Sequence, residues 1–188
     1  MKKLILLSVI LLAMVQVGSA QVNNVQTNHH NPQWETPLIK GYGPIKYYSS
    51  AKIQPDKSLD YKVVFKITDG KIKDGVDNHL WHMARLLNLL YAAGVKPDHI
   101  HIVGVIAGKS TPVILNNKAY QKRFHKNNPN MDLLKQLTEH GVKIYVCDQA
   151  VAEHGIDLHQ DLNKYIVPTL SAIIDLPTFQ LKGYALMP

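Results

Sequence analysis

Cysteine is nearly absent from this chain of 188 residues, which contains only Cys147. A single cysteine cannot form a disulfide within its own chain, so a disulfide-stapled scaffold is excluded. The dithiol chemistry of a Cys-x-x-Cys motif is excluded for the same reason. Two interpretations of Cys147 stay open: a small buried hydrophobic residue, or a free thiol that reacts or pairs between molecules.

Long apolar runs are also scarce. The run from Leu4 to Val15 is too short for a comfortable membrane span, and no later run is long enough either. Lys2 and Lys3 precede this run, and Gly18-Ser19-Ala20 follows it, which is the layout of a secretory signal peptide over residues 1–20. We therefore expect cleavage before Gln21, a periplasmic or secreted protein, and no membrane span in the mature chain.

Neither the charge nor the histidines indicate a further class of site. The net charge of +7 is spread along the chain, and no basic stripe interleaved with aromatic residues is present, so we expect no nucleic-acid partner. The ten histidines include three closely spaced pairs: His29 and His30, His79 and His82, and His99 and His101. None of these pairs has the third ligand that makes a zinc signature, so we expect neither a metal nor a cofactor.

The order of elements predicts the fold class. Residues 21–60 are polar and broken by four prolines, which indicates an irregular N-terminal arm. From residue 61 onward, strands alternate with helices. Strands are predicted at 61–68, 99–106, 142–147, 167–170 and 184–187, and helices at 76–93, 112–124, 131–140, 149–154, 158–165 and 171–181. This alternation predicts an α/β domain over residues 61–188, with three layers and a mainly parallel sheet of about five strands covered by helices on both faces.

The helix predicted at 76–93 is apolar nearly all round. Its polar residues are confined to a narrow stripe that contains Asn78, His82 and Arg85. A helix of this kind is buried on more than one side. We therefore expect it to pack on the sheet and against another subunit, in a homo-oligomer.

Ligands of parallel sheets gather at the carboxyl ends of the strands. Cys147 ends a strand there and opens a helix, whose N-terminus favours a thiolate, whereas the neighbouring carboxylate of Asp148 opposes it. Gly108, Lys109 and Ser110 follow another strand. The backbone amides of this loop could hold an anion, or the loop could be a plain connection.

Several segments resemble one known family. Tyr61-Lys-Val-Val-Phe, Ala84-Arg-Leu-Leu-Asn-Leu and Val146-Cys-Asp-Gln are similar to segments of the DsrE/DsrF-like family, and Ile39-Lys-Gly-Tyr-Gly resembles the lead-in of its exported bacterial members. The resemblance covers residues 37–188. It implies a small α/β domain that assembles as trimers or hexamers, in a family whose cytoplasmic members pass sulfur along as a cysteine persulfide. Cys147 matches their active cysteine.

The chain departs from that pattern in two places. Asp148 stands where exported relatives often have glycine, and Ala107 stands where they tend to have histidine. The loss of that histidine removes a possible acid, base or ligand close to the cysteine.

Two functional hypotheses follow. The first is sulfur handling through a persulfide or mixed disulfide on Cys147, with a sulfur-donor or sulfur-acceptor protein as partner, so that the chain is at most a sulfurtransferase-like carrier. The second is a non-catalytic oligomeric module that binds a small anion or ligand at the strand-end cleft. The candidate binding residues are Asn78, His82, Gly108, Lys109, Ser110 and Gln149.

Overall fold

The computed structural model describes residues 32–188. The predicted signal peptide, the first part of the arm, and the pair His29 and His30 lie outside the described residues. The described residues form one compact unit. Within it, no helix is long and apolar enough to cross a membrane.

A five-stranded sheet lies at the centre of this unit, in the order β6-β5-β4-β1-β7, and all of its strand pairs are parallel. The strands are β1 (Tyr61–Ile67), β4 (Ile100–Ile106), β5 (Lys143–Cys147), β6 (Ile166–Thr169) and β7 (Ala185–Met187). The helices are α1 (Asn78–Ala92), α2 (Asn117–Phe124), α3 (Met131–Glu139), α4 (Asp148–Glu153) and α5 (Ala172–Leu181). The predicted α/β class and parallel sheet are confirmed.

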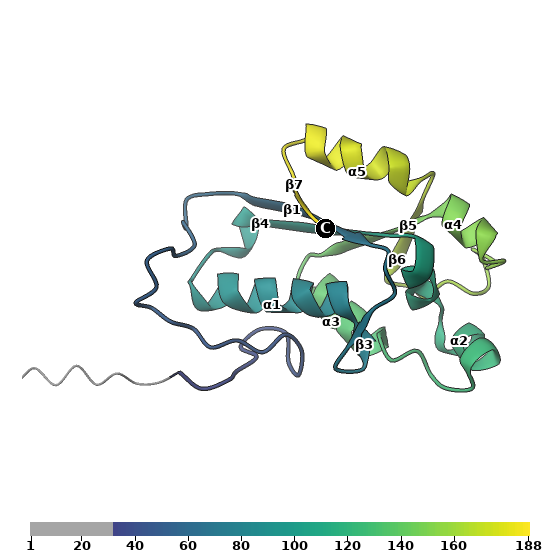
Figure 1. The fold of residues 1–188 in the computed structure, drawn as a ribbon, viewed down its shortest axis with the longest axis horizontal. Coiled ribbons are helices and arrows are strands. Elements are labelled where there is room, and N and C mark those ends of the chain that lie inside the picture. Colours follow the sequence, from purple (N-terminus) through teal and green to yellow (C-terminus); the bar gives the residue numbers. More distant parts are fainter. Residues whose placement is uncertain (1–31) are drawn as a thin grey trace, which may run out of the picture. The chain divides into compact units, whose positions relative to one another are not determined.

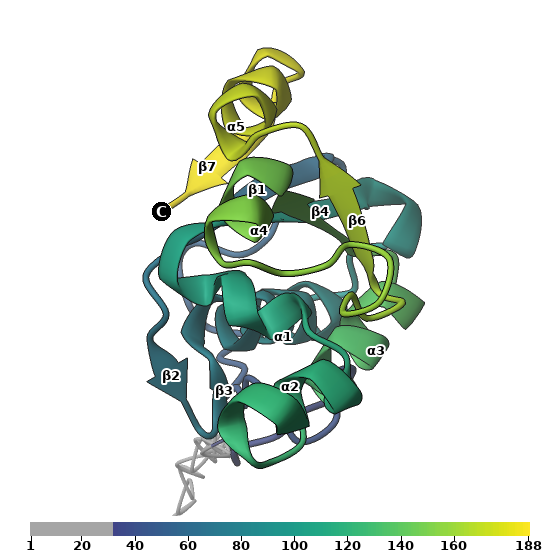
Figure 2. The same ribbon diagram turned by 90° about the vertical axis from the view of Figure 1, so that its right-hand side faces the viewer.

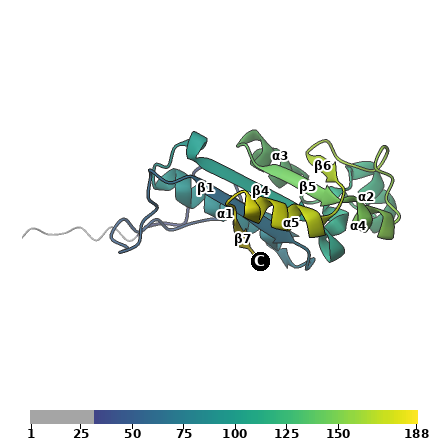
Figure 3. The ribbon, with the colours of Figure 1, turned by 90° about the horizontal axis from the view of Figure 1, so that it is seen from above.

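The sheet separates two hydrophobic cores, and helices α1 and α3 cover one face while α5 covers the other (Figures 1 and 2). Seen from above, α5 crosses over β4 and β1 (Figure 3). Successive side chains of a strand point to opposite faces. In β4, Ile102 and Ile106 therefore belong to the core under α1, while Val103 and Val105 belong to the core under α5.

Several predicted segments differ from the structure, among them the helix predicted at 112–124, which begins at Asn117. Helix α1 begins at Asn78 rather than at residue 76, because β3 (Val76–Asp77) pairs with β2 (Ile72–Lys73) in a small hairpin. The carboxylate of Asp77 then caps the helix by accepting from the His79 amide at 2.9 Å. The loop predicted at 108–112 is part of a 3-10 helix (Gly108–Ile114), and the helix predicted at 158–165 is formed by turns.

The outer side of α1 is covered by the arm of the same chain. The side chain of Asn88 is fully buried and binds four backbone groups of the arm. Its Oδ1 accepts from the amides of Leu38 and Ile39 at 3.0 and 2.8 Å, and its Nδ2 donates to the carbonyls of Tyr42 and Gly43 at 2.9 and 3.0 Å. The arm of the same chain therefore covers a side of α1 for which the sequence suggested a second subunit.

Candidate functional site

Cys147 lies at the carboxyl edge of the sheet, where the sequence places it. The parallel register pairs Ile106 of β4 with Val146 of β5, so the two strands end side by side. Within β5, Ile144 and Val146 point into the core under α1, whereas Tyr145 and Cys147 point toward α5. The thiol therefore belongs to the α5 side of the sheet.

The sulfur of Cys147 is enclosed in the single subunit. The residue is 5% exposed, and it packs with Val105, Ala150 and Ala172. Its Sγ lies 3.9 Å from the hydroxyl oxygen of Ser171, the residue that caps α5. The start of α5 therefore screens most of the thiol from solvent.

Two polar residues that follow Cys147 belong to the same neighbourhood. Gln149 donates from Nε2 to the carbonyl oxygen of Leu170 at 3.2 Å, and this contact ties α4 to the segment before α5. The Oδ1 atom of Asp148 is buried and accepts no hydrogen bond from residues 32–188. A buried carboxylate oxygen without a donor costs free energy.

The predicted binding loop at Gly108 uses its polar groups within the fold. The Ser110 hydroxyl donates to Asp77 Oδ2 at 2.9 Å and accepts from the Gly70 amide at 3.0 Å. The Lys109 amide donates to the Thr68 carbonyl at 3.0 Å. Gly108 has φ +55°, and a Cβ there would lie 3.1 Å from the Thr68 oxygen. The loop therefore joins the ends of β1 and β4, and the pocket beside it measures about 180 Å³.

Two other predicted residues, Asn78 and His82, lie on α1 and therefore on the opposite side of the sheet from Cys147. The ring of His82 contacts the Asn78 carbonyl oxygen through Nδ1 at 2.7 Å and lies edge-on to Trp81. Of the predicted site residues, the structure thus brings only Gln149 into the neighbourhood of Cys147.

His79 lies between the carboxylates of Asp69 and Asp77, and Asp77 also accepts a hydrogen bond from Ser110. Its Nδ1 is 3.6 Å from Asp69 Oδ1 and 3.6 Å from Asp77 Oδ1. The Lys71 amide, which donates to Asp69 Oδ1 at 2.9 Å, lowers the pKa of Asp69, and the nearby His79 acts in the same direction. Within residues 32–188, no group of three His, Cys, Asp or Glu side chains is arranged to hold a metal ion.

Sequence reasoning missed Ser171 as the polar neighbour of the thiol. The available signal was its position just after the predicted strand at 167–170, since a serine there is a strong N-cap candidate. It also missed an exposed apolar surface around α5. Ile173 is 85% exposed and Leu181 is 90% exposed. Ile174 of the same helix and Leu170 just before it are exposed as well.

Two solved structures are similar to this chain. The protein is similar in structure to a protein of unknown function from Methanobacterium thermoautotrophicum, with 21% identity, a TM-score of 0.51, and coverage of 68% of this chain and 98% of that one. The ychN protein from E. coli also matches, with 13% identity, a TM-score of 0.42, and coverage of 66% and 95%.

No curated protein matches the sequence. A family model does match, over residues 80–188, which is more than half of the chain and includes most of α1 together with Cys147 and α5. This chain belongs to the DsrE/DsrF-like family.

Proposed function

We propose that the protein carries sulfur as a persulfide on Cys147. Membership of the DsrE/DsrF-like family suggests sulfur relay in general. The observation that carries the proposal is the position of the chain's single cysteine at the carboxyl edge of the sheet. This edge is where parallel α/β folds place their reactive groups.

The proposed transfer balances without a redox cofactor. The Cys147 thiolate attacks the outer sulfur of a donor persulfide, R–S–SH. The S–S bond of the donor breaks, R–S⁻ leaves and takes up a proton, and Cys147 retains the outer sulfur as Cys–S–SH. An acceptor thiolate removes that sulfur by the same step in reverse. The donor and acceptor are therefore thiols of a partner protein or of a small molecule.

The enclosure of the thiol makes access the controlling step. The Ser171 side chain accepts from the Ile173 amide at 3.4 Å, and the Thr169 hydroxyl donates to the Asp175 carboxylate, so two contacts fix the start of α5 over the sulfur. We propose that a contact on the exposed face of α5 loosens this turn. The partner that we propose for this contact is a second copy of the chain, in a homotrimer or hexamer, because exposed apolar surface like that of α5 is unusual on a monomer.

The test is transfer of sulfur to the purified protein from glutathione persulfide, followed by mass spectrometry of the intact chain. We expect the native protein to gain the mass of one sulfur atom and the Cys147→Ser variant to gain none. Because the chain has one cysteine, the variant is a complete control.

A thiol that takes up no sulfur and resists alkylation until the protein is denatured would refute sulfur carriage. With that outcome, the second hypothesis would hold, a binding module in which the buried thiol of Cys147 is structural. The strand-end pocket of about 180 Å³ is small beside the roughly 300–1,000 Å³ of ordinary ligand sites, so such a module would need a pocket completed by a second subunit.

We also propose that the protein is exported, on the evidence of Lys2, Lys3 and the apolar run that follows them. N-terminal sequencing of protein from its native host should begin near Gln21. An intact Met1 terminus would refute the proposal.

A further inference from the structure

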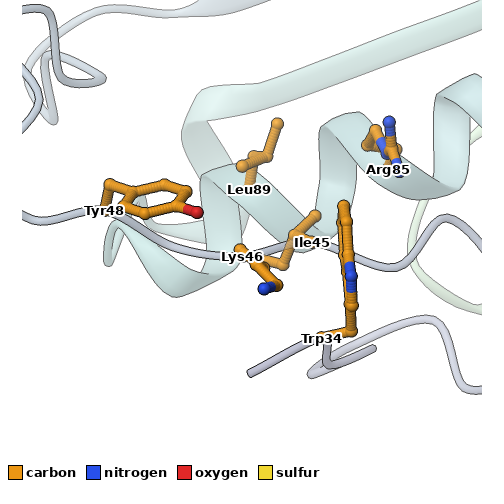
Figure 4. Close-up of a pocket in the computed structure, with 6 residues that line it drawn as sticks. All are labelled: Trp34, Ile45, Lys46, Tyr48, Arg85 and Leu89. Carbon is orange, nitrogen blue, oxygen red and sulfur yellow. The ribbon is translucent and has the colours of Figure 1, made fainter. Parts of the chain in front are cut away.

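A second pocket lies between the arm and α1 and shares no residue with the neighbourhood of Cys147. It measures about 350 Å³. Its lining combines aromatic, aliphatic and cationic side chains: Trp34, Ile45, Lys46, Tyr48, Arg85 and Leu89 (Figure 4). The volume is within the range of small-molecule sites.

The local structure of the arm builds one side of this pocket. Glu35 and Ile45 form an antiparallel bridge, with N···O distances of 2.9 and 2.8 Å in the two directions. This register places Trp34 directly opposite Lys46, so the two side chains share one face. The Lys46 ammonium nitrogen lies 5.4 Å from the centroid of the Trp34 ring, within cation–π range.

Helix α1 supplies the other cation in a fixed position. Arg85 donates from Nε to the Pro44 carbonyl at 3.0 Å, and its guanidinium carbon lies 4.2 Å from the Trp81 ring and 5.7 Å from the Trp34 ring. In Figure 4 the Trp34 ring is seen nearly edge-on, with Lys46 and Arg85 on either side of it. Because Asn88 fastens the arm to α1 nearby, the pocket is formed before any ligand arrives.

The aromatic surface of the pocket is open to solvent. Trp34 is 62% exposed and Tyr48 is 52% exposed, while Ile45 beneath them is buried. Exposed aromatic faces beside an aliphatic floor favour a flat, apolar ring, which gains both area and stacking geometry there.

The charge of the pocket selects an anion. Both charged lining residues are cations, and within residues 32–188 neither Lys46 nor Arg85 forms an ion pair with a carboxylate. The terminal guanidinium nitrogens of Arg85 likewise donate no hydrogen bond to the described part of the chain. These nitrogens and the Lys46 ammonium are thus available to a carboxylate, which matches them in charge and geometry.

We propose that this pocket binds a small aromatic carboxylate. The ring of the ligand lies on Ile45 and Leu89 between the side chains of Trp34 and Tyr48, and its carboxylate contacts Lys46 and Arg85. This site goes beyond the proposed sulfur chemistry, because it lies on the α1 side of the sheet and requires no thiol.

The test uses 2-naphthoate as the probe, with 2-naphthylmethanol as its uncharged analogue and acetate as the anion without a ring. We expect saturable binding of 2-naphthoate in calorimetry, with the indole N–H signal of Trp34 shifting in NMR spectra. The analogue and acetate should bind at least about tenfold more weakly, because each loses one of the two interactions.

Two lysines of the arm provide the matched variants. Lys46→Met should weaken 2-naphthoate binding about tenfold or more, whereas Lys52→Met, an exposed arm lysine that does not line the pocket, should leave it unchanged. Trp34→Ala should abolish binding, and an unchanged thermal transition shows that the variant is folded.

Three results would overturn the proposal. These are no saturable binding of 2-naphthoate, equal affinity for the uncharged analogue, and equal affinity of the Lys46→Met and Lys52→Met variants. A change of oligomeric state in Trp34→Ala without probe binding in the wild type would assign the surface to a second copy of the chain instead. Since none of these readouts involves Cys147, they are independent of the sulfur-transfer test.

Discussion

The attachment of the arm to α1 depends on one buried side chain, and its removal gives a sharp prediction. Asn88→Leu keeps the approximate shape of the residue but deletes all four hydrogen bonds to the arm. A net hydrogen bond contributes about 0.5–1.5 kcal/mol, so the four together contribute about 2–6 kcal/mol. Backbone groups that stay buried without partners cost more, so we expect the arm to leave α1 in this variant.

Gln136 provides the matched control. Its side-chain amide also binds the arm, accepting from the Lys40 amide at 2.7 Å and donating to the Lys40 carbonyl at 3.1 Å, but these contacts are exposed to water. Gln136→Leu should therefore cost less than about 1 kcal/mol, because water replaces the lost partners.

Urea unfolding followed by circular dichroism measures both variants, and limited proteolysis reports the arm directly. We expect Asn88→Leu to lower the free energy of unfolding by at least about 2 kcal/mol and to expose the arm to cleavage. If Asn88→Leu is no more destabilising than Gln136→Leu, then the arm is not held by this amide and the reasoning fails.

Three further predictions concern other parts of the molecule. Ser171→Ala removes the N-cap of α5, which contributes about 1 kcal/mol. Alkylation of the single cysteine in the native protein should therefore become about fivefold faster. An unchanged rate would show that α5 does not control access to the thiol. Ile173→Asp should dissociate the proposed homo-oligomer in light scattering, whereas Ile53→Asp, at a similarly exposed residue in the arm, should not. The hydrogen bond from the ring of His99 lowers the pKa of Asp60. This pair therefore stabilises the fold above the unfolded pKa of about 3.9, and its contribution is lost as the pH falls through the lower pKa of the folded state. His99→Phe should raise the NMR titration midpoint of Asp60.

The sheet was readable from the sequence because its strands are dense in β-branched residues. The run at 100–106 consists mostly of valine and isoleucine, and the run at 61–67 combines valine and isoleucine with two aromatic residues. The position of Cys147 at a strand end followed from the same pattern. Its direction did not, because Ile144, Tyr145 and Val146 are all apolar and an apolar run carries no alternation from which a face can be assigned.

The contacts of the candidate site were less accessible to sequence reasoning. Ser171 is 24 residues from Cys147 along the chain, and the Asp77–Ser110 bond spans 33 residues. Such pairs are set by the order of strands in the sheet, which places β6 beside β5 and β4 beside β1. Local propensity does not report that order, so the sequence could not indicate that Ser110 bonds to Asp77 or that the Lys109 amide bonds to Thr68.

In α1, the apolar residues of the sequence predict that the helix is buried, but they do not predict which part of the protein buries it. The sequence indicated correctly that this helix is enclosed on more than one side, but counting apolar residues cannot distinguish a second subunit from a distant part of the same chain. Asn88 carried the missing information, since a polar amide amid Leu86, Leu87, Leu89 and Leu90 needs backbone partners when it is buried. An irregular segment with unpaired amides and carbonyls supplies such partners, and the arm at 38–43 is the segment that binds there. The apolar surface that remains open lies instead on α5, a helix too short and too evenly apolar for its periodicity to reveal an exposed face.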